Sequence, residues 1–342
     1  MPLLSALAGD PEIEALLSDA SQLDAMLAFE RALAEASAEV GFIAAEAAAV
    51  IDAALSDYVP DWPGLEAGMA QDGVVVPTLV KQLKDGLPEA NKPALHKGAT
   101  SQDVTDTALM LQLAKVFDLY EARLSALLER FDALAAEHGG KALMAHTRMQ
   151  VALPTTWGAK LVSWSEPLKR HLRSLVAMRP SLLVIQLGGP VGDRGSFGTH
   201  GNAIAAGMAK RLDLGLATPW QATRDPIVAL GSLLAQISGS LGKLGMDVTL
   251  LAQNEVGAVR LEGGGGSSAM AHKSNPVNAE VLIALARANA GLSGTLAQAQ
   301  LHENERSGAA WTLEWLTLPP MLVNTGASLR LAQKLLDQLR IA

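Results

Sequence analysis

The 342-residue chain contains no cysteine, and aromatic residues make up only 4% of it. The absence of cysteine excludes disulfide frameworks, thiol nucleophiles and cysteine-ligated zinc sites. Hydrophobic residues still account for 49% of the chain. The core therefore has to be built from closely packed Ala, Leu, Val and Met, a composition that favours helices.

The chain also lacks any block of basic residues, and its formal net charge is −8. This balance argues against a nucleic-acid or anionic-membrane surface, so we expect a small molecule as the partner. The N-terminal segment lacks the basic flank and cleavage site of a secretory signal. The longest uncharged stretch, 226–242, is interrupted by Ser, Gln and Gly and is a better buried helix than a membrane span. We therefore expect a soluble, cytoplasmic protein.

Two apolar heptads dominate the sequence, one running from Ile227 to Leu251 and the other from Leu109 to Leu134. Such stripes require partner helices. The first stripe contains glycines that we interpret as positions of close helix packing: Gly231, Gly239, Gly242 and Gly245. No alternating strand pattern recurs, and the run 182–187 is the one strand-like piece. The prediction is an all-α protein built on a bundle of long helices.

We predict three parts along the chain. Residues 1–90 would form an N-terminal helical domain with loops at 60–64 and 86–93, and residues 91–330 the central long-helix bundle. Residues 331–342 would form a short C-terminal tail.

Polar segments interrupt the helices at three places, and function is expected there. The first, 96–107, begins with His96 and precedes a long helix. Thr100 or Ser101 could simply cap that helix, with Asp103 in its first turn. Alternatively, the hydroxyls and free backbone N–H groups form a cradle for a carboxylate.

The second polar segment, 145–158, places His146, Arg148 and Gln150 in a turn-like stretch before Pro154. An arginine here could belong to a surface ion pair. Its planar guanidinium is also well suited to binding a carboxylate through two hydrogen bonds.

The third polar segment, 263–276, starts with four consecutive glycines followed by Ser267, Ser268, Lys273 and Asn275. The glycines indicate a mobile lid, the alternative being a flexible linker. Neither this segment nor 188–192 has the glycine spacing of a phosphate loop. The chain has no G-x-S-x-G or H-E-x-x-H motif, which disfavours serine hydrolase and zinc protease activity.

In this order, the three segments resemble the signature regions of the fumarase/aspartase superfamily. The third is the most specific, since G-S-S-x-M-x-x-K-x-N-P stands at 266–276, and 26–43 resembles the superfamily's first helix. The resemblance covers essentially the whole chain. It implies a homotetramer with a central helix bundle, active sites shared by three subunits, and no cofactor or metal.

The chemistry implied by the resemblance is anti addition or elimination next to a carboxylate, through a carbanion stabilised as an aci-carboxylate. Ser267 would transfer the proton at carbon, while Lys273 and Asn275 would hold the carboxylate. The resemblance places further substrate contacts at other polar residues of the three segments: Thr100, Ser101, Gln150 and Ser268.

Two departures separate this chain from adenylosuccinate lyases in the same branch. Arg148 stands where those enzymes carry the histidine that protonates the leaving amine, and the stretch 71–77 lacks their second histidine. The tail 301–315 instead resembles the E-R-x-x-G-x-W-x-x-E-W segment of bacterial carboxymuconate cycloisomerases. We therefore expect lactonisation of 3-carboxy-cis,cis-muconate.

A triply anionic substrate would account for a set of cations: Lys273, Arg148, His96 and Arg306. Two differences from the family pattern remain, since Ala271 replaces the usual proline and the usual C-terminal helical domain is largely absent. The alternatives are an adenylosuccinate-type C–N lyase and a catalytically silent structural homologue.

Overall fold

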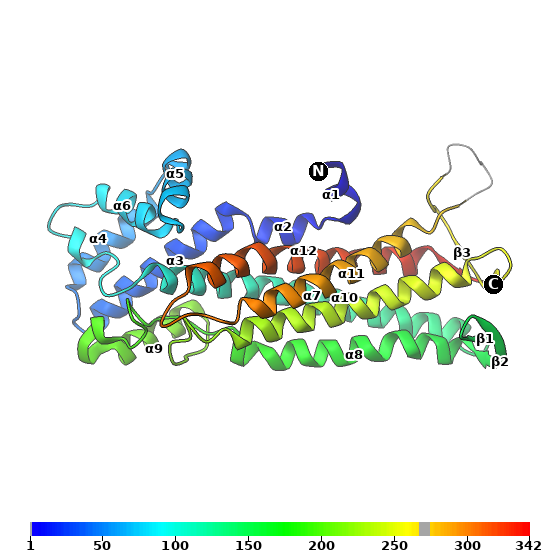
Figure 1. The fold of residues 1–342 in the computed structure, drawn as a ribbon. Helices are drawn as coiled ribbons and strands as arrows, with labels where there is room; N and C mark the ends of the chain where they lie inside the picture. The colour runs from blue at the N-terminus through cyan, green and yellow to red at the C-terminus, as the bar shows by residue number, and fades with distance from the viewer. Residues whose placement is uncertain (1, 267–273) are drawn as a thin grey trace.

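The computed structural model describes residues 2–266 and 274–342. It shows an elongated, mostly helical molecule, which confirms the all-α prediction (Figure 1). Its bundle consists of long helices: α7 (Ser101–His138), α8 (Trp157–Leu182), α10 (Asp225–Leu251), α11 (Val277–Gln298) and α12 (Gly308–Gln338). The shorter helices are α1 (Pro2–Ala8), α2 (Pro11–Leu16), α3 (Asp19–Glu39), α4 (Ala45–Ser56), α5 (Trp62–Asp72), α6 (Val76–Asp85) and α9 (Gly201–Leu212), with 3₁₀ turns η1 (Lys92–Ala94) and η2 (Gly195–His200).

The two predicted heptads form the helices at the centre of the bundle. Helix α10 buries its apolar stripe against α8, α11 and α12, and α7 packs against α3, α8 and α12. By length and composition α10 could also cross a membrane, but more than half of its most apolar window is buried inside the bundle. The apolar stripes thus find their partners within the chain.

Three of the four glycines on α10 are close-packing positions, as predicted. A Cβ on Gly242 would lie 2.5 Å from the Cβ of Ala286, and one on Gly245 would lie 2.5 Å from the carbonyl oxygen of Ala279. A Cβ on Gly231 would collide with Leu296. A Cβ on Gly239 would meet open space within the chain, so a packing role for this glycine stays a prediction.

A lobe of short helices caps one end of the bundle, on the left in Figure 1. Within it α3 packs against α4, α7 and α9. The helix predicted over 26–43 is α3, but both predicted ends are wrong. The helix begins at Asp19 because Ser18 caps it, and it ends at Glu39, just before Gly41 adopts φ +74°.

The second polar segment is a β-hairpin rather than the predicted turn-like loop. Strands β1 (Ala142–Thr147) and β2 (Gln150–Thr156) pair antiparallel, with Thr147 opposite Gln150. Arg148 and Met149 form the turn at φ +49° and +66°. Two successive left-handed residues are typical of a type I′ hairpin turn, whose usual sequence at these two positions is Asn-Gly.

The strand-like run 182–187 does not form a named strand. Helix α8 continues to Leu182, and Val184 makes an isolated parallel bridge with Gly215. At the far end of the chain α12 continues past residue 330 to Gln338, and β4 (Leu339–Ile341) pairs with β3 (Val259–Leu261). The division into three parts stays a prediction.

Candidate active site

The start of α7 is fixed by a buried carboxylate. Asp103 accepts hydrogen bonds from the backbone N–H groups of Thr100 (3.1 Å), Gly188 (2.7 Å) and Gly189 (2.9 Å), and from Nε2 of Gln186 (3.1 Å). Burial raises the pKa of Asp103, while these hydrogen bonds oppose the rise. Thr100 is the N-cap residue, so the capping interpretation is confirmed. Asp103 also ties the first segment to the loop that follows α8.

Arg306 reaches this end of α7 from the segment before α12. Its Nε donates to Oε1 of Gln102 at 2.9 Å, and its Nη2 donates to the carbonyl oxygen of Pro190 at 3.3 Å. Gln102 is fully buried and donates in turn to the carbonyl oxygen of Gln221 at 2.8 Å. The fold therefore brings the predicted Arg306 to the first polar segment.

His96 is paired with a carboxylate of its own chain. Its Nδ1 lies 2.6 Å from Oε1 of Glu30, a side chain of α3 that is 1% exposed. Burial alone would lower the pKa of His96, but the charge and hydrogen bond of Glu30 raise it above its ordinary value. When His96 is protonated, Glu30 is its anionic partner, and the role of His96 in substrate binding stays a prediction.

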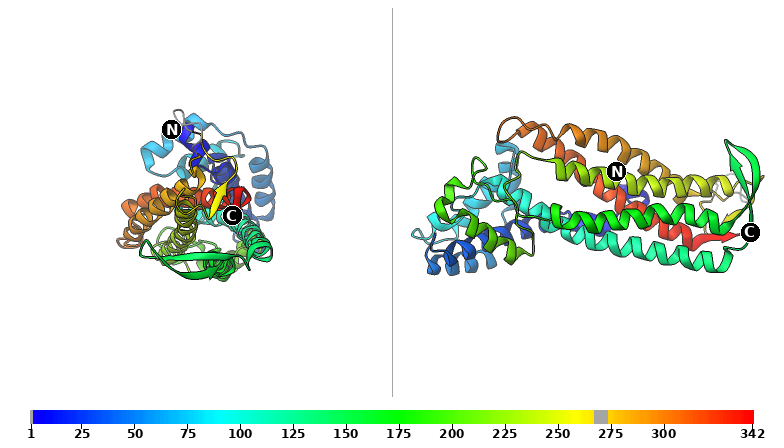
Figure 2. Two further views of the ribbon diagram at one scale, coloured as in Figure 1. Left: turned by 90° about the vertical axis from the view of Figure 1, so that its right-hand side faces the viewer. Right: turned by 90° about the horizontal axis from the view of Figure 1, so that it is seen from below.

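The second polar segment lies at the opposite end of the bundle. Arg148 and Gln150 are exposed on the hairpin, and Arg148 has no ion-pair partner among the described residues. Helix α7 has 38 residues, so it spans about 55 Å at a rise of about 1.5 Å per residue. Because the hairpin follows its C-terminal end, Arg148 is far from Ser101 (Figures 1 and 2).

The third segment is described only at its edges. Ser267, Ser268 and Lys273 lie outside the described residues. Asn275 forms an antiparallel bridge with Gly265 through backbone N···O distances of 2.8 and 3.0 Å. This bridge lies at the same end of the bundle as the hairpin (Figure 1). Thus the described part of one chain places His96, Thr100, Ser101 and Arg306 at one end, and Arg148, Gln150 and Asn275 at the other.

Sequence reasoning missed a buried ionic cluster beside the first segment. Arg224 is 1% exposed and binds Asp106 of α7 at 2.7 Å and Glu314 of α12 at 2.6 Å. The Trp220 ring lies 4.6 Å from the guanidinium carbon. Both carboxylates occur within motifs noticed in the sequence, but nothing local identified their partner. The cluster fixes the starts of α7, α10 and α12 relative to one another.

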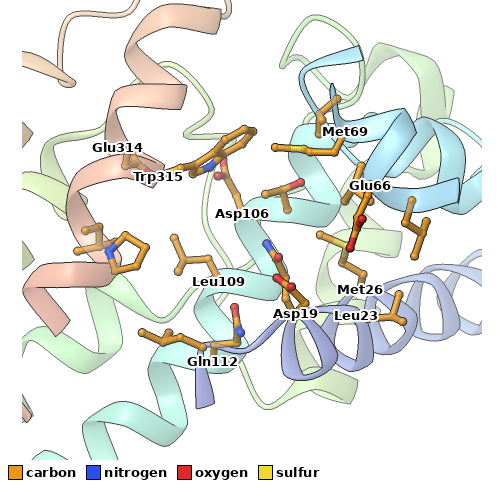
Figure 3. Close-up of a pocket in the computed structure, with 18 of the residues that line it drawn as sticks. Asp19, Leu23, Met26, Glu66, Met69, Asp106, Leu109, Gln112, Glu314 and Trp315 are labelled. Carbon is orange, nitrogen blue, oxygen red and sulfur yellow. The ribbon is translucent and has the colours of Figure 1, made fainter. Parts of the chain in front are cut away.

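A cavity of about 560 Å³ lies beside this cluster, between α3, α5, α7 and α12 (Figure 3). Its walls are mostly apolar and include Leu23, Met26 and Leu109. Among the described residues, its polar lining consists of carboxylates, amides, a hydroxyl and two indoles, with no Lys, Arg or His. Within residues 2–266 and 274–342, no group of three His, Asp or Glu side chains could hold a metal ion.

Comparison with known proteins places this architecture. The sequence model of a protein family described as lyase matches residues 10–291. The 3-carboxy-cis,cis-muconate cycloisomerase of Pseudomonas aeruginosa is 40% identical over 337 residues, which are 96% of this chain and 73% of that protein. The chain belongs to this lyase family. Membership confirms the resemblance to the fumarase/aspartase superfamily that the three polar segments predicted.

Two further comparisons extend the likeness within the fumarase/aspartase family. The 3-carboxy-cis,cis-muconate cycloisomerase of Pseudomonas putida is 38% identical over 97% of this chain and 80% of its own length. The crystal structure of the 3-carboxy-cis,cis-muconate lactonizing enzyme from Pseudomonas putida has a TM-score of 0.93 at 37% identity, covering 100% of this chain and 78% of that one. The match includes both ends of the bundle.

Proposed function

We propose that this enzyme is an isomerase that converts 3-carboxy-cis,cis-muconate to 4-carboxymuconolactone. Two named relatives carry the corresponding activity in their names. The observation that carries the proposal is the residue at the exposed hairpin tip. An arginine cannot release a proton near neutral pH, so Arg148 is unsuited to protonating a leaving amine. Lactonisation has no leaving group and needs no such acid.

The proposed reaction is an intramolecular addition. A substrate carboxylate oxygen, already ionised at neutral pH, attacks the double bond and forms the new C–O bond. The electron pair moves onto the carbon next to another carboxylate, which holds it as an aci-carboxylate. Ser267 then gives its hydroxyl proton to that carbon and recovers a proton from solvent. The substrate supplies both nucleophile and acceptor, so the step uses no cofactor or metal.

Each binding role in the proposal follows from the charge or the hydrogen-bonding groups of a side chain. Arg148 would align the attacking carboxylate, and Lys273 with Asn275 would stabilise the aci-carboxylate. Thr100, Ser101 and Arg306 would bind another carboxylate at the start of α7, where free N–H groups favour an anion. Gln150 and Ser268 would contribute further hydrogen bonds, and His96 a nearby positive charge.

We further propose a cytoplasmic homotetramer in which three subunits contribute to each site. Support comes from the length of α7, which separates Thr100 and Arg306 from Arg148 and Asn275 within one chain. Groups that act on one small substrate have to lie within a few ångströms of it. Copies running in opposite directions would bring the two ends together.

The substrate can be tested directly by ultraviolet absorbance. Purified enzyme is mixed separately with 3-carboxy-cis,cis-muconate and with adenylosuccinate. We expect loss of the diene absorbance with the first substrate and no reaction with the second. Turnover of adenylosuccinate alone would identify a C–N lyase instead. Inactivity on both, in a folded tetramer, would favour the structural homologue.

Shared sites can be tested by mixing an inactive variant with one that binds substrate weakly, and by measuring turnover at substrate concentrations well below KM. Ser267→Ala should abolish turnover with little loss of stability, and near-normal kcat would place the proton donor elsewhere. Co-refolding Ser267→Ala with Arg148→Ala should restore about a quarter of the sites if they come from different subunits and assembly is random. No recovery in mixed tetramers would contradict shared sites.

A further inference from the structure

The cavity beneath α5 continues the face of α7 that begins at Ser101. Thr105 follows Ser101 by one helical turn, and its Oγ1 donates to the carbonyl oxygen of Ser101 at 3.0 Å. Leu109 and Gln112 follow at similar spacing, and both line the cavity together with Thr105. Residues at this spacing share one face of a helix. The part of the cavity lined by α7 therefore begins one helical turn from Ser101, which belongs to the proposed carboxylate cradle.

Much of the cavity wall is apolar. Leu23 and Met26 of α3, Met69 of α5 and Trp315 of α12 form much of its wall (Figure 3). Its volume of about 560 Å³ falls within the range of roughly 300–1,000 Å³ that is usual for small-molecule sites. The space exceeds what the carboxylate cradle alone would need.

The polar groups of the cavity disfavour a further anion. Asp19 and Glu66 line it with exposed carboxylates. Asp106 and Glu314 also line it, but Arg224 neutralises part of their charge from behind. Since no Lys, Arg or His among the described residues of the chain lines the cavity, its own carboxylates would repel a phosphate or carboxylate placed there. A hydrocarbon group would instead exchange water for apolar contacts.

We propose that this cavity is a specificity site that accepts an apolar substituent on the substrate. This inference rests on the proposed function, because the polar end of the substrate would be held at the start of α7. The enzyme then acts on polycarboxylate dienes that carry an alkyl group, and binds them more tightly than the unsubstituted diene. Substrates that place an additional anionic group in the cavity react more slowly.

The test compares 3-carboxy-cis,cis-muconate with derivatives that carry methyl, ethyl or propyl on a free vinyl carbon, each isomer separately. For at least one isomer series, kcat/KM should rise roughly fourfold for each methylene that enters the cavity. A carboxymethyl derivative is close in size to the propyl compound. Its kcat/KM should be at least tenfold lower than that of the propyl compound. Glu66→Gln removes one carboxylate from the cavity and should reduce this difference in kcat/KM.

Two filling variants, Leu109→Trp from α7 and Met69→Trp from α5, place a large ring in the cavity from different helices. In either one, the ratio of kcat/KM for the propyl and unsubstituted substrates should fall toward one. Leu111→Trp is the matched control, because Leu111 is on α7 but does not line the cavity. This control should retain the wild-type ratio.

The outcomes separate this inference from the proposed function. If the unsubstituted diene is converted but no alkyl derivative reacts faster, the specificity site is wrong and the activity stands. If the filling variants keep the alkyl preference, the substituent binds elsewhere and the assignment to this cavity is overturned. If neither diene is converted, the proposed function fails, and the inference fails with it.

Discussion

The two ends of the bundle differ in how their functional residues are supported. At the start of α7, Asp103 and Gln102 are fully buried and hydrogen-bonded to neighbouring loops. On the hairpin, Met149, Val151 and Leu153 are 76%, 67% and 74% exposed. Clustered exposed apolar side chains are typical of an interface. One end is thus organised by the chain's own contacts, whereas the other exposes apolar side chains that could be buried in the tetramer that we propose.

The largest effect is expected from removing the buried cation at the end of the bundle where α7 starts. Arg224→Met leaves Asp106 and Glu314 buried without their counter-ion, which should lower the free energy of unfolding by about 3–5 kcal/mol. Urea denaturation followed by circular dichroism measures this change. A loss below about 1 kcal/mol would mean that the start of α7 does not depend on the cluster.

At the hairpin end, Arg148→Ala should affect activity and leave stability nearly unchanged. Losing two-point contact with a carboxylate should lower kcat/KM about a hundredfold, mostly through KM, which corresponds to about 2.7 kcal/mol. The free energy of unfolding should change by less than about 0.5 kcal/mol, because Arg148 is exposed. Arg148→Lys is the matched variant, since it keeps the positive charge but lacks the planar guanidinium that donates two parallel hydrogen bonds. Wild-type kinetics in Arg148→Ala would remove this residue from the site.

His96, at the same end of the bundle, should make the free energy of unfolding depend on pH. Because Glu30 raises the pKa of His96, the pair is fully stabilising below the unfolded-state pKa of about 6.5, and this contribution is lost as pH rises through the folded-state pKa. His96→Asn keeps a residue that tolerates φ +60° but removes the cation. Its deficit in unfolding free energy, about 1.5 kcal/mol near pH 6, should shrink above that pKa.

Urea titrations at several pH values measure this deficit. Glu30→Gln should show the same pH trend, since it removes the other member of the pair. A deficit that is constant from acid to alkaline pH would show that the charge on His96 contributes nothing.

The smallest expected effect on folding is at the hairpin tip. Met149→Ser removes an exposed apolar side chain, so the free energy of unfolding of a single chain should change by less than about 0.5 kcal/mol. If the hairpin lies in a subunit interface, the same change should weaken assembly in sedimentation velocity at low protein concentration. Leu316→Ser, on the exposed side of α12, tests whether the loss of any exposed apolar side chain weakens assembly.

Local sequence patterns predicted which stretches are helical better than they predicted where elements begin, end or turn. The heptads of α7 and α10 were recognisable because every third or fourth residue shares one helix face. The hairpin was missed because its turn uses Arg148 and Met149, which seldom adopt left-handed conformations, and because its apolar residues face outward. Gly239 has no close neighbour within the chain, and sequence does not reveal which face of a helix has one.

By itself, the sequence determined the helical class, the family and the chemical identity of the three polar segments, because these depend on residue order along the chain. Only the tertiary structure decided that Arg306 meets Gln102 from 204 residues away, that Arg224 joins Asp106 to Glu314, and that an acidic, apolar cavity lies below Ser101. Such contacts depend on how whole helices pack, and many packings are compatible with the same local periodicity.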